Sequence, residues 1–341
     1  MSVGVGVVGS GFMGRTWCNV AQRTDGAHFV GVGGGRRAPA LADDLGCRLF
    51  ADVDELLKSP DVQLVVLTSP PAAHAAQTVA AAANGKAVLV EKPMAQNVEE
   101  CVRMVEACDS AGTVLAVVSQ HRFRAAPRAA EALVRAGEIG SITMARVVGP
   151  ASGWWDVEKT QDAWKLDPSQ QTAFASWGAH ACDLLRWLLA DEPDLAFALF
   201  AQYSDDPPPG RSAMATYRFR GGAMAQLWMS YDIPRPGLGS GLQLFLVGTD
   251  GMLDVDCYGD VRLGKGDDWT MVYQQPPFDA TDPIDPLRLE AYSGELRDVL
   301  GAMASRRRPL VDGHEGVATT AMLEAAEQSA RLARSVEVPR S

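Results

Sequence analysis

The first fourteen residues constrain the fold of this chain more than any other stretch. Residues 3–8 are apolar and predict a short strand, Gly9-Ser10-Gly11-Phe12-Met13-Gly14 follows at once, and residues 15–23 can form a helix. A strand, a G-x-G-x-x-G turn and a helix are typical of a dinucleotide-binding fold, in which N–H groups of the helix N-terminus face the phosphates. Gly9 would then allow the tight turn, Gly11 would let the backbone approach a pyrophosphate, and Gly14 would let the helix lie close to the strand. The alternative is a glycine-rich turn that binds no ligand.

Strands and helices alternate through the first third of the chain. Apolar runs predict further strands over residues 28–33, 64–68, 87–90 and 114–118, with helical segments between them. This rhythm predicts a doubly wound parallel sheet, a Rossmann α/β domain over residues 1–120. Ligands of such sheets bind at the carboxyl ends of the strands. The candidate site loops therefore directly follow three predicted strands, at Ser69-Pro70-Pro71, Glu91-Lys92-Pro93 and Ser119-Gln120-His121-Arg122.

The pattern changes after residue 120, where longer segments alternate between apolar and polar residues. These segments predict strands over residues 142–148, 195–203, 213–219, 223–231, 243–247 and 252–258. Gly221-Gly222 and Thr249-Asp250-Gly251 are hairpin signals between neighbouring strands. We therefore predict a second, α+β domain over residues 121–341 with a mostly antiparallel sheet. Helices are predicted at 178–189, 290–305 and 316–332.

Composition limits the partners and the location of a chain of 341 residues. A formal net charge of −11 disfavours nucleic acid and anionic membrane surfaces as partners. The sequence has no apolar run of about 20 residues, which a membrane span needs, and it begins without the basic and apolar regions of a secretory signal. The six cysteines are scattered, without the spacing of a zinc site. We therefore expect a cytoplasmic protein with reduced thiols, a small-molecule substrate and no bound metal.

The choice between NADP and NAD depends on the residues after the second predicted strand. An NAD-preferring fold usually has Asp or Glu there, which binds the ribose 2′-OH. This chain has Gly33-Gly34-Gly35-Arg36-Arg37, and two arginines can pair with a 2′-phosphate. We therefore expect NADP in preference to NAD, with Arg36 and Arg37 as candidate ligands. The alternative is that both arginines are solvated, and the sequence does not indicate which one points inward.

Two residues are the main candidates for acid–base chemistry. Lys92 follows a sheet strand and precedes a rigid proline, so its ammonium can hydrogen-bond a substrate hydroxyl or carbonyl oxygen. His180 lies near the start of a predicted helix and can take a proton near neutral pH, while Asp183 one turn later can orient it or bind a substrate hydroxyl. The alternatives are a solvated loop lysine, a buried core histidine and a solvated helix charge.

A tryptophan-rich stretch over residues 149–173 is a candidate lid. Aromatic faces stack on sugar rings, although the same tryptophans can simply bury a long loop. Positive charge in this stretch and after residue 120 suits a carboxylated substrate. The expected substrate contacts are Arg122, Arg124, Trp155, Trp164 and Lys165.

Several of these motifs together resemble the Gfo/Idh/MocA oxidoreductases. The matching residues are the glycine turn, Ser69-Pro70 with His74, Glu91-Lys92-Pro93, Gly178-Ala179-His180-x-x-Asp183-Leu184-Leu185-x-Trp187, and the tail from Asp312-Gly313 through Ser329-Ala330. The resemblance implies a nicotinamide cofactor, Lys92 as the catalytic lysine and His180 as the catalytic histidine. It also implies an open-faced C-terminal sheet that joins a homodimer or homotetramer. The expected cofactor contacts are Gly9, Ser10, Gly11, Phe12, Met13, Gly14, Arg36, Arg37, Ser69, Pro70, His74, Glu91, Lys92 and Gln120.

One position departs from the pattern of this family. The family usually has an aspartate four residues before the histidine, where this chain has Ser176, which can orient an imidazole but cannot supply charge. We expect an NAD(P)-dependent oxidoreductase that transfers hydride between the cofactor and a hydroxyl or carbonyl of a sugar, glycoside or cyclic polyol, with Ser176 and Asp183 supporting Lys92 and His180. One alternative is a relative that uses tightly bound cofactor without net redox, as a lyase, hydrolase or decarboxylase. The other is a catalytically silent nucleotide-binding protein.

Overall fold

The computed structural model describes residues 2–150, 167, 169–170, 172–203, 210–234, 237–238 and 241–340, and it divides into two compact units. The first unit contains Met1–Phe123 and Phe278–Val317, and the second contains Arg124–Pro277 and Ala318–Ser341. The sequence predicted one boundary at residues 120 and 121, and it assigned residues 278–317 to the second domain. The structure differs on this segment, which belongs to the first unit.

A six-stranded parallel sheet forms the centre of the first unit, in the order β3-β2-β1-β4-β5-β6. The order reverses at β1, which is the arrangement of a doubly wound fold. Strand β4 is a continuous apolar run because all four of its residues are buried. The strands are β1 Val3–Val8, β2 Ala27–Gly33, β3 Arg48–Phe50, β4 Leu64–Leu67, β5 Ala87–Val90 and β6 Leu115–Val117. The sheet confirms the predicted Rossmann-like fold.

Helices pack two separate apolar cores against this sheet. One core contains residues of α1 Phe12–Arg23, α2 Ala38–Leu45 and α9 Pro286–Ser305. The other contains residues of α3 Val53–Lys58, α4 His74–Ala83 and α5 Val98–Ala111. Tyr292 of α9 packs edge-to-face with Trp17 of α1, with ring centroids 5.0 Å apart. This packing gives the apolar face of α9 its partner, which is why residues after 277 return to the first unit.

A nine-stranded sheet forms the centre of the second unit, in the order β14-β13-β12-β11-β7-β10-β9-β8-β15. Its neighbouring strands are antiparallel except for β7 and β10, which pair in parallel. This confirms the predicted mostly antiparallel sheet, although β13, β14 and β15 were not predicted. The strands are β7 Ile142–Pro150, β8 Pro193–Ala201, β9 Ser212–Phe219, β10 Met224–Ser230, β11 Gln243–Gly248, β12 Met252–Asp256, β13 Val261–Lys265, β14 Asp268–Tyr273 and β15 Val336–Glu337.

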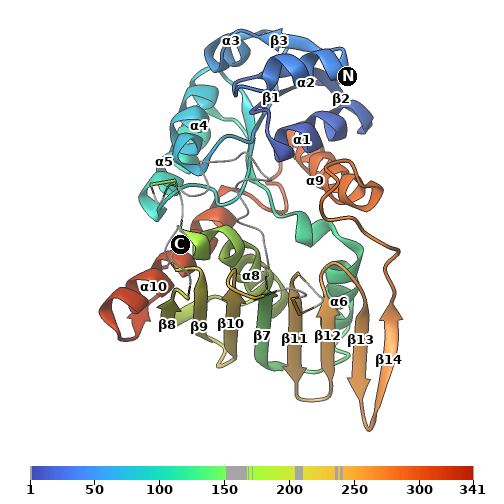
Figure 1. Cartoon of the computed structure of the whole chain (residues 1–341), viewed down its shortest axis with the longest axis vertical. Helices are drawn as coiled ribbons and strands as arrows, with labels where there is room; N and C mark the ends of the chain where they lie inside the picture. Colours follow the sequence, from blue (N-terminus) through green and yellow to red (C-terminus); the bar gives the residue numbers. More distant parts are fainter. Residues whose placement is uncertain are drawn as a thin grey trace. The chain divides into compact units, whose positions relative to one another are not determined.

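In the described part of the chain, helices pack on one face of the second sheet, and the other, the open face, carries exposed side chains. Helix α6 Ala125–Arg135 contacts β12, β13 and β14, and helix α8 Ala173–Leu189 contacts β7 and β10 (Figure 1). The last helix, α10, runs over Gly313–Leu332. Apolar side chains at alternate positions on the open face are about half exposed. They include Met144, Leu199, Met214 and Met224.

Candidate functional site

The glycine turn after β1 has the geometry that a dinucleotide requires. Gly9 has φ +107°, and a Cβ there would lie 2.5 Å from Thr68 Oγ1. A Cβ on Gly14 would lie 2.3 Å from the carbonyl oxygen of Gly9, so helix α1 can lie this close to the turn only with glycine. At Gly11 the one described atom within 4 Å of an added Cβ is Nη2 of Arg37, at 3.3 Å. The three glycines therefore fit the roles predicted for them, and the turn fits a dinucleotide phosphate.

The turn after β2 lies directly against the glycine turn. Gly34 and Gly35 have φ of +77° and +85°, and a Cβ on Gly35 would lie 2.4 Å from Ser10 Oγ. Such backbone conformations strain residues with a side chain. Arg36 and Arg37 are both exposed, but it is the Arg37 guanidinium that reaches Gly11. The structure thus separates two arginines that the sequence treated alike.

Glu91 and Lys92 follow β5 at the carboxyl edge of the same sheet. Glu91 is buried and accepts two hydrogen bonds, from Trp17 Nε1 to its Oε1 at 2.9 Å and from the Lys92 N–H to its Oε2 at 3.2 Å. Burial raises the pKa of the Glu91 carboxyl, although the charge of Lys92 and the Trp17 hydrogen bond oppose this. Sequence reasoning missed Trp17, because nothing in the spacing of residues 17 and 91 indicates a contact.

His74 connects the loops that follow β4 and β5. Its Nδ1 lies 3.1 Å from the Pro93 carbonyl oxygen and 3.2 Å from that of Met94, and its Nε2 lies 2.8 Å from that of Ser69. The side chain is 0% exposed, and burial lowers the pKa of the imidazole. Both ring nitrogens thus face backbone carbonyls, and the cofactor contact expected for His74 stays a prediction.

The residues after β6 form a buried turn, η2, over Gln120–Phe123. Arg122 is 3% exposed, and its Nη2 lies 2.5 Å from Oε2 of Glu315. The backbone N–H of Ser119 donates to Glu295 Oε1 at 2.6 Å. Carboxylates from the C-terminal part of the chain thus hold this turn, and the substrate role expected for Arg122 stays a prediction. Gln120 and the partly buried Ser69 and Pro70 also lie at this edge of the sheet.

Helix α8 of the second unit carries Ser176, His180 and Asp183 on one face, because they are spaced by four and three residues. All three are buried, with 5 to 7% of each residue exposed. Trp177 packs edge-to-face with the His180 imidazole, with ring centroids 5.8 Å apart. Burial raises the pKa of the Tyr231 phenol, and the neighbouring Ser176 hydroxyl opposes that increase. Ser176 thus has a neutral phenol beside it.

Aromatic residues extend this part of the second unit toward Arg124. The Arg124 guanidinium carbon lies 4.5 Å from the centroid of the Tyr258 ring. A Cβ on Gly241 would lie 3.6 Å from Tyr258 and 3.7 Å from Trp177, so Gly241 contacts both rings. Sequence reasoning named Arg124 but missed Trp177, Tyr231 and Tyr258, which sit in ordinary apolar strand and helix patterns. The predicted contacts Trp155, Trp164 and Lys165 lie outside the described residues.

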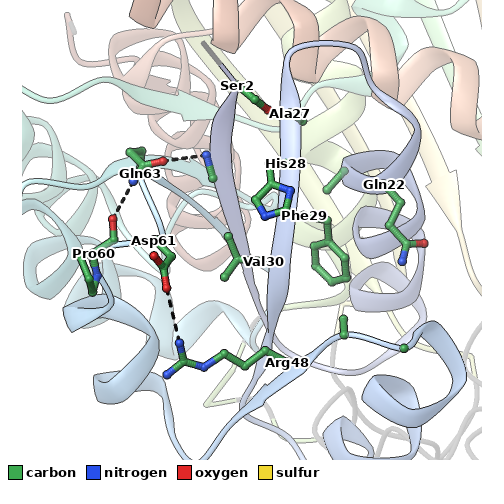
Figure 2. A pocket seen from close by; sticks show the side chains of 14 residues that line it. Ser2, Gln22, Ala27, His28, Phe29, Val30, Arg48, Pro60, Asp61 and Gln63 are labelled. Atoms are coloured by element: carbon green, nitrogen blue, oxygen red, sulfur yellow. Dashed lines mark hydrogen bonds and ion pairs between the residues drawn. The ribbon is translucent and has the colours of Figure 1, made fainter.

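A hollow of about 680 Å³ lies at the other end of the parallel strands. Its lining includes the first residues of β1 and β2. Figure 2 shows the Arg48 side chain pointing to Asp61, 3.7 Å away, and the Gln63 amide donating to the Pro60 carbonyl oxygen at 2.8 Å. The Gly4 N–H donates to Gln63 Oε1 at 2.7 Å. These polar groups pair with one another, and the hollow is at the edge opposite the one where such sheets bind nucleotides.

The described ranges hold neither a cluster of metal ligands nor a membrane-spanning helix. There, no group of three or more His, Cys, Asp or Glu side chains is arranged to hold a metal ion. In the same part of the chain, no helix has both the length and the apolarity that crossing a membrane requires. All six cysteines are described and free of disulfides, and all but Cys47 are buried.

The fold and the glycine turn define an oxidoreductase class with an NAD-binding Rossmann domain. Residues 3–119 match the family model described as "Oxidoreductase family, NAD-binding Rossmann fold", and residues 128–254 match the GFO/IDH/MocA C-terminal domain. The chain therefore belongs to the Gfo/Idh/MocA family, as the sequence motifs predicted.

Comparisons with individual proteins agree with this assignment. The chain is 37% identical over 198 residues to inositol 2-dehydrogenase 3 of Saccharopolyspora erythraea, covering 56% of this chain and 55% of that protein. It is 27% identical over 346 residues to 1,5-anhydro-D-fructose reductase of Ensifer adhaerens, covering 98% of both. An oxidoreductase of Agrobacterium radiobacter, solved with NAD⁺, L-tartaric acid and magnesium, has the same fold, with a TM-score of 0.87 at 20% identity over 99% of both chains. The chain spans about half the length of the first curated relatives that it matches.

Proposed function

We propose that this protein is an NAD(P)-dependent dehydrogenase or reductase that acts on a CH–OH group of a sugar, glycoside or cyclic polyol. The observation that carries the proposal is the position of Lys92 on the same sheet edge as the glycine turn, because β1 and β5 both run parallel to β4. A reactive cation is thereby set beside a nucleotide-binding turn. The relatives named as an inositol dehydrogenase and an anhydrofructose reductase support this substrate class.

The acid–base chemistry is assigned to Lys92 and His180. When bound, the nicotinamide accepts or returns the hydride of the substrate C–H bond. His180 takes the hydroxyl proton during oxidation and returns it during reduction, and the Lys92 ammonium stabilises negative charge on the oxygen. Asp183 lies on the same helix face as His180 and orients it, together with Ser176.

NADP is proposed as the preferred cofactor. Arg37 reaches the glycine turn, and Gly34 and Gly35 stand where an acidic residue would bind the ribose hydroxyls of NAD. An arginine there can pair with a 2′-phosphate in fork geometry. Titration of the purified protein with NADPH and NADH, followed by fluorescence, tests the preference, and equal affinities would refute it.

Ser176 motivates a second candidate, in which bound cofactor is used without net redox. Serine supplies no charge to His180, and the neighbouring Tyr231 phenol is held neutral by burial. A weaker base suits a reaction in which oxidation is transient and the cofactor is regenerated in place. An absorbance spectrum of the untreated protein separates the two candidates, because cofactor that stays bound through purification supports the second.

The open face of the second sheet is proposed as the contact with a second copy of this chain. Phe197, Leu199, Met214 and Met224 are 40 to 59% exposed, and pairing in register brings them to one face. Exposed apolar patches of this kind mark protein interfaces. Light scattering of wild type and of Met214→Arg tests the proposal, and a monomeric wild type would end it.

The free cysteines favour a reducing compartment such as the cytoplasm for this chain. All six are free of disulfides, and burial raises the pKa of the Cys18, Cys182 and Cys257 thiols. Such thiols are poor nucleophiles and serve as core residues. A thiol count on the denatured protein as isolated checks this, and fewer than six free thiols would argue against it.

Turnover of a panel of polyols, sugars and glycosides tests the proposed function directly. The variants Lys92→Ala and His180→Asn are expected to lower kcat by at least about 100-fold while cofactor affinity changes little. The matched control is Lys86→Met, which removes a buried lysine whose Nζ donates to the carbonyl oxygens of Ser59 and Val62. Full activity in the Lys92→Ala variant would show that the site is assigned wrongly.

A further inference from the structure

The loop that carries Lys92 is held by buried side chains on both sides of that residue. Trp17 binds the side chain of Glu91, directly before Lys92, and His74 contacts the carbonyls of Pro93 and Met94, directly after it. We propose that Trp17 and His74 are positioning residues that together fix Lys92 for the reaction. The inference rests on the proposed role of Lys92, and it assigns a positioning role to two residues that are each 0% exposed.

The contact on the first side links the nucleotide-binding helix to the catalytic loop. Trp17 lies on α1, which begins at Phe12 within the glycine turn, and it is 0% exposed. Its indole N–H fixes one oxygen of Glu91, and the other oxygen accepts the Lys92 N–H. Tyr292 supports the indole edge-to-face at 5.0 Å. The Glu91 carboxylate therefore connects Trp17 to the Lys92 backbone, and loss of the Trp17 hydrogen bond would free that carboxylate to move.

The contact on the second side links two strand-end loops. The His74 ring spans the distance between the Ser69 carbonyl after β4 and the Pro93 and Met94 carbonyls after β5. The N–H of a neutral imidazole donates to one of these sites, and the ring fills the space between them. A smaller side chain would leave the Lys92 loop without this support. The carbonyls would then be buried without their partner.

Both side chains act through the backbone, because neither has exposed surface that a bound molecule could contact. Trp17 and His74 are each 0% exposed within the folded chain. A reacting group displaced by about 1 Å can cost on the order of 100-fold in rate. Loss of either residue should therefore lower kcat while KM stays close to its wild-type value.

Five variants of the full chain separate positioning from simple loss of packing. Trp17→Phe keeps an aromatic ring but removes the N–H donor, and His74→Ala removes the ring. The matched controls are Val20→Ala on α1 and Thr78→Ala on α4, which also remove fully buried atoms from the same two helices. His74→Gln restores a donor of similar reach and should recover part of the loss.

Two measurements are made on each folded variant. Hydrogen–deuterium exchange reports the protection of the Lys92 and Met94 amides, and initial rates report kcat and KM. We expect about tenfold faster exchange at these amides in Trp17→Phe and His74→Ala than in their controls. We expect kcat to fall by about 10- to 100-fold with KM changed less than about threefold.

The outcomes distinguish this proposal from the proposed function. Faster exchange in the two variants would show that Trp17 and His74 hold the Lys92 loop in place, whether or not the wild-type protein turns over a polyol or sugar. If the wild-type protein turns over neither, the proposed function fails while the structural role of the two residues stands. Exchange and kcat equal to those of Val20→Ala and Thr78→Ala would overturn the positioning role. If one of Trp17→Phe and His74→Ala fails to fold, the other carries the same comparison, and exchange and kcat equal to those of its control would overturn the positioning role.

Discussion

The Thr172 hydroxyl donates a hydrogen bond of 2.5 Å to Oε1 of Glu327. The same hydroxyl oxygen accepts the Ala175 N–H at 3.0 Å, which makes Thr172 the N-cap of α8. One side chain therefore both begins the helix that carries Ser176, His180 and Asp183 and ties it to α10. The orientation of this helix face depends on that contact.

Replacement of Thr172 tests the N-cap. Thr172→Ala should lower the free energy of unfolding by about 1–2 kcal/mol, because it removes the N-cap acceptor and leaves Glu327 without its donor. Thr172→Ser keeps both hydrogen bonds and should lose less than about 0.5 kcal/mol. Urea unfolding of the three proteins measures the difference. Equal losses in the two variants would mean that the threonine methyl group, and not the hydroxyl, supports the helix.

Glu327 should make the stability of the protein depend on pH. Burial raises the pKa of its carboxyl from the ordinary value of 4.5, and the Thr172 hydrogen bond opposes only part of this. The folded state therefore holds the proton more tightly than the unfolded state, so the contribution to stability is present below pH 4.5 and is lost as pH rises through the folded-state pKa. Glu327→Gln stays neutral and should gain stability relative to wild type as pH rises toward 7. Urea titrations across this pH range check the sign, and a gain that grows on acidification would contradict it.

Replacing Gly14 and replacing Gly11 should affect different properties of the protein, stability in the first case and cofactor binding in the second. Gly14→Ala should destabilise the protein by about 1–3 kcal/mol, because its Cβ would overlap the Gly9 carbonyl oxygen. Gly11→Ala should lower the free energy of unfolding by at most about 1 kcal/mol, since its Cβ meets the end of a flexible arginine side chain. The same variant should weaken cofactor binding by about tenfold or more, because the added Cβ would block the phosphates. Thermal unfolding and cofactor titration separate the two effects. The control is Gly46→Ala, at φ +60° and with open space around it, which should affect stability alone.

The two arginines after β2 should differ in their effect on cofactor choice. Arg37→Ala should weaken NADPH binding by about 10- to 100-fold, the loss expected for a charge-assisted hydrogen bond, and should change NADH binding by less than about threefold. Arg36→Ala is the matched control, because it also removes an exposed arginine of this turn, while Arg37 is the one that reaches Gly11. Fluorescence titrations with both cofactors decide the question. A larger effect from Arg36 than from Arg37 would reverse the assignment.

Local sequence patterns predicted most elements of the fold and only some contacts of the site. Five strands of the first sheet and six strands of the second are continuous apolar or alternating runs, so their period is visible in the sequence. Strand β3 was not predicted, because it is short and only one of its three residues is buried. Helix α8 begins at Ala173, ahead of the predicted start at 178, because the Thr172 side chain caps it. The Thr172 hydroxyl is held in turn by Glu327, which is distant in the sequence. Strand β14 was missed because its residues are mostly exposed and lack an apolar period.

The sequence by itself determined the glycine turn, the strand-end position of Lys92 and the helical spacing of His180 and Asp183, because each depends on residues close together in the chain. The tertiary structure decided which arginine reaches the turn, that α9 returns to the first unit, and that Trp17 and His74 enclose the Lys92 loop. These relationships join residues 19 to more than 200 positions apart, and they form only when helices pack on a sheet. Local periodicity carries no information on which buried side chains then meet.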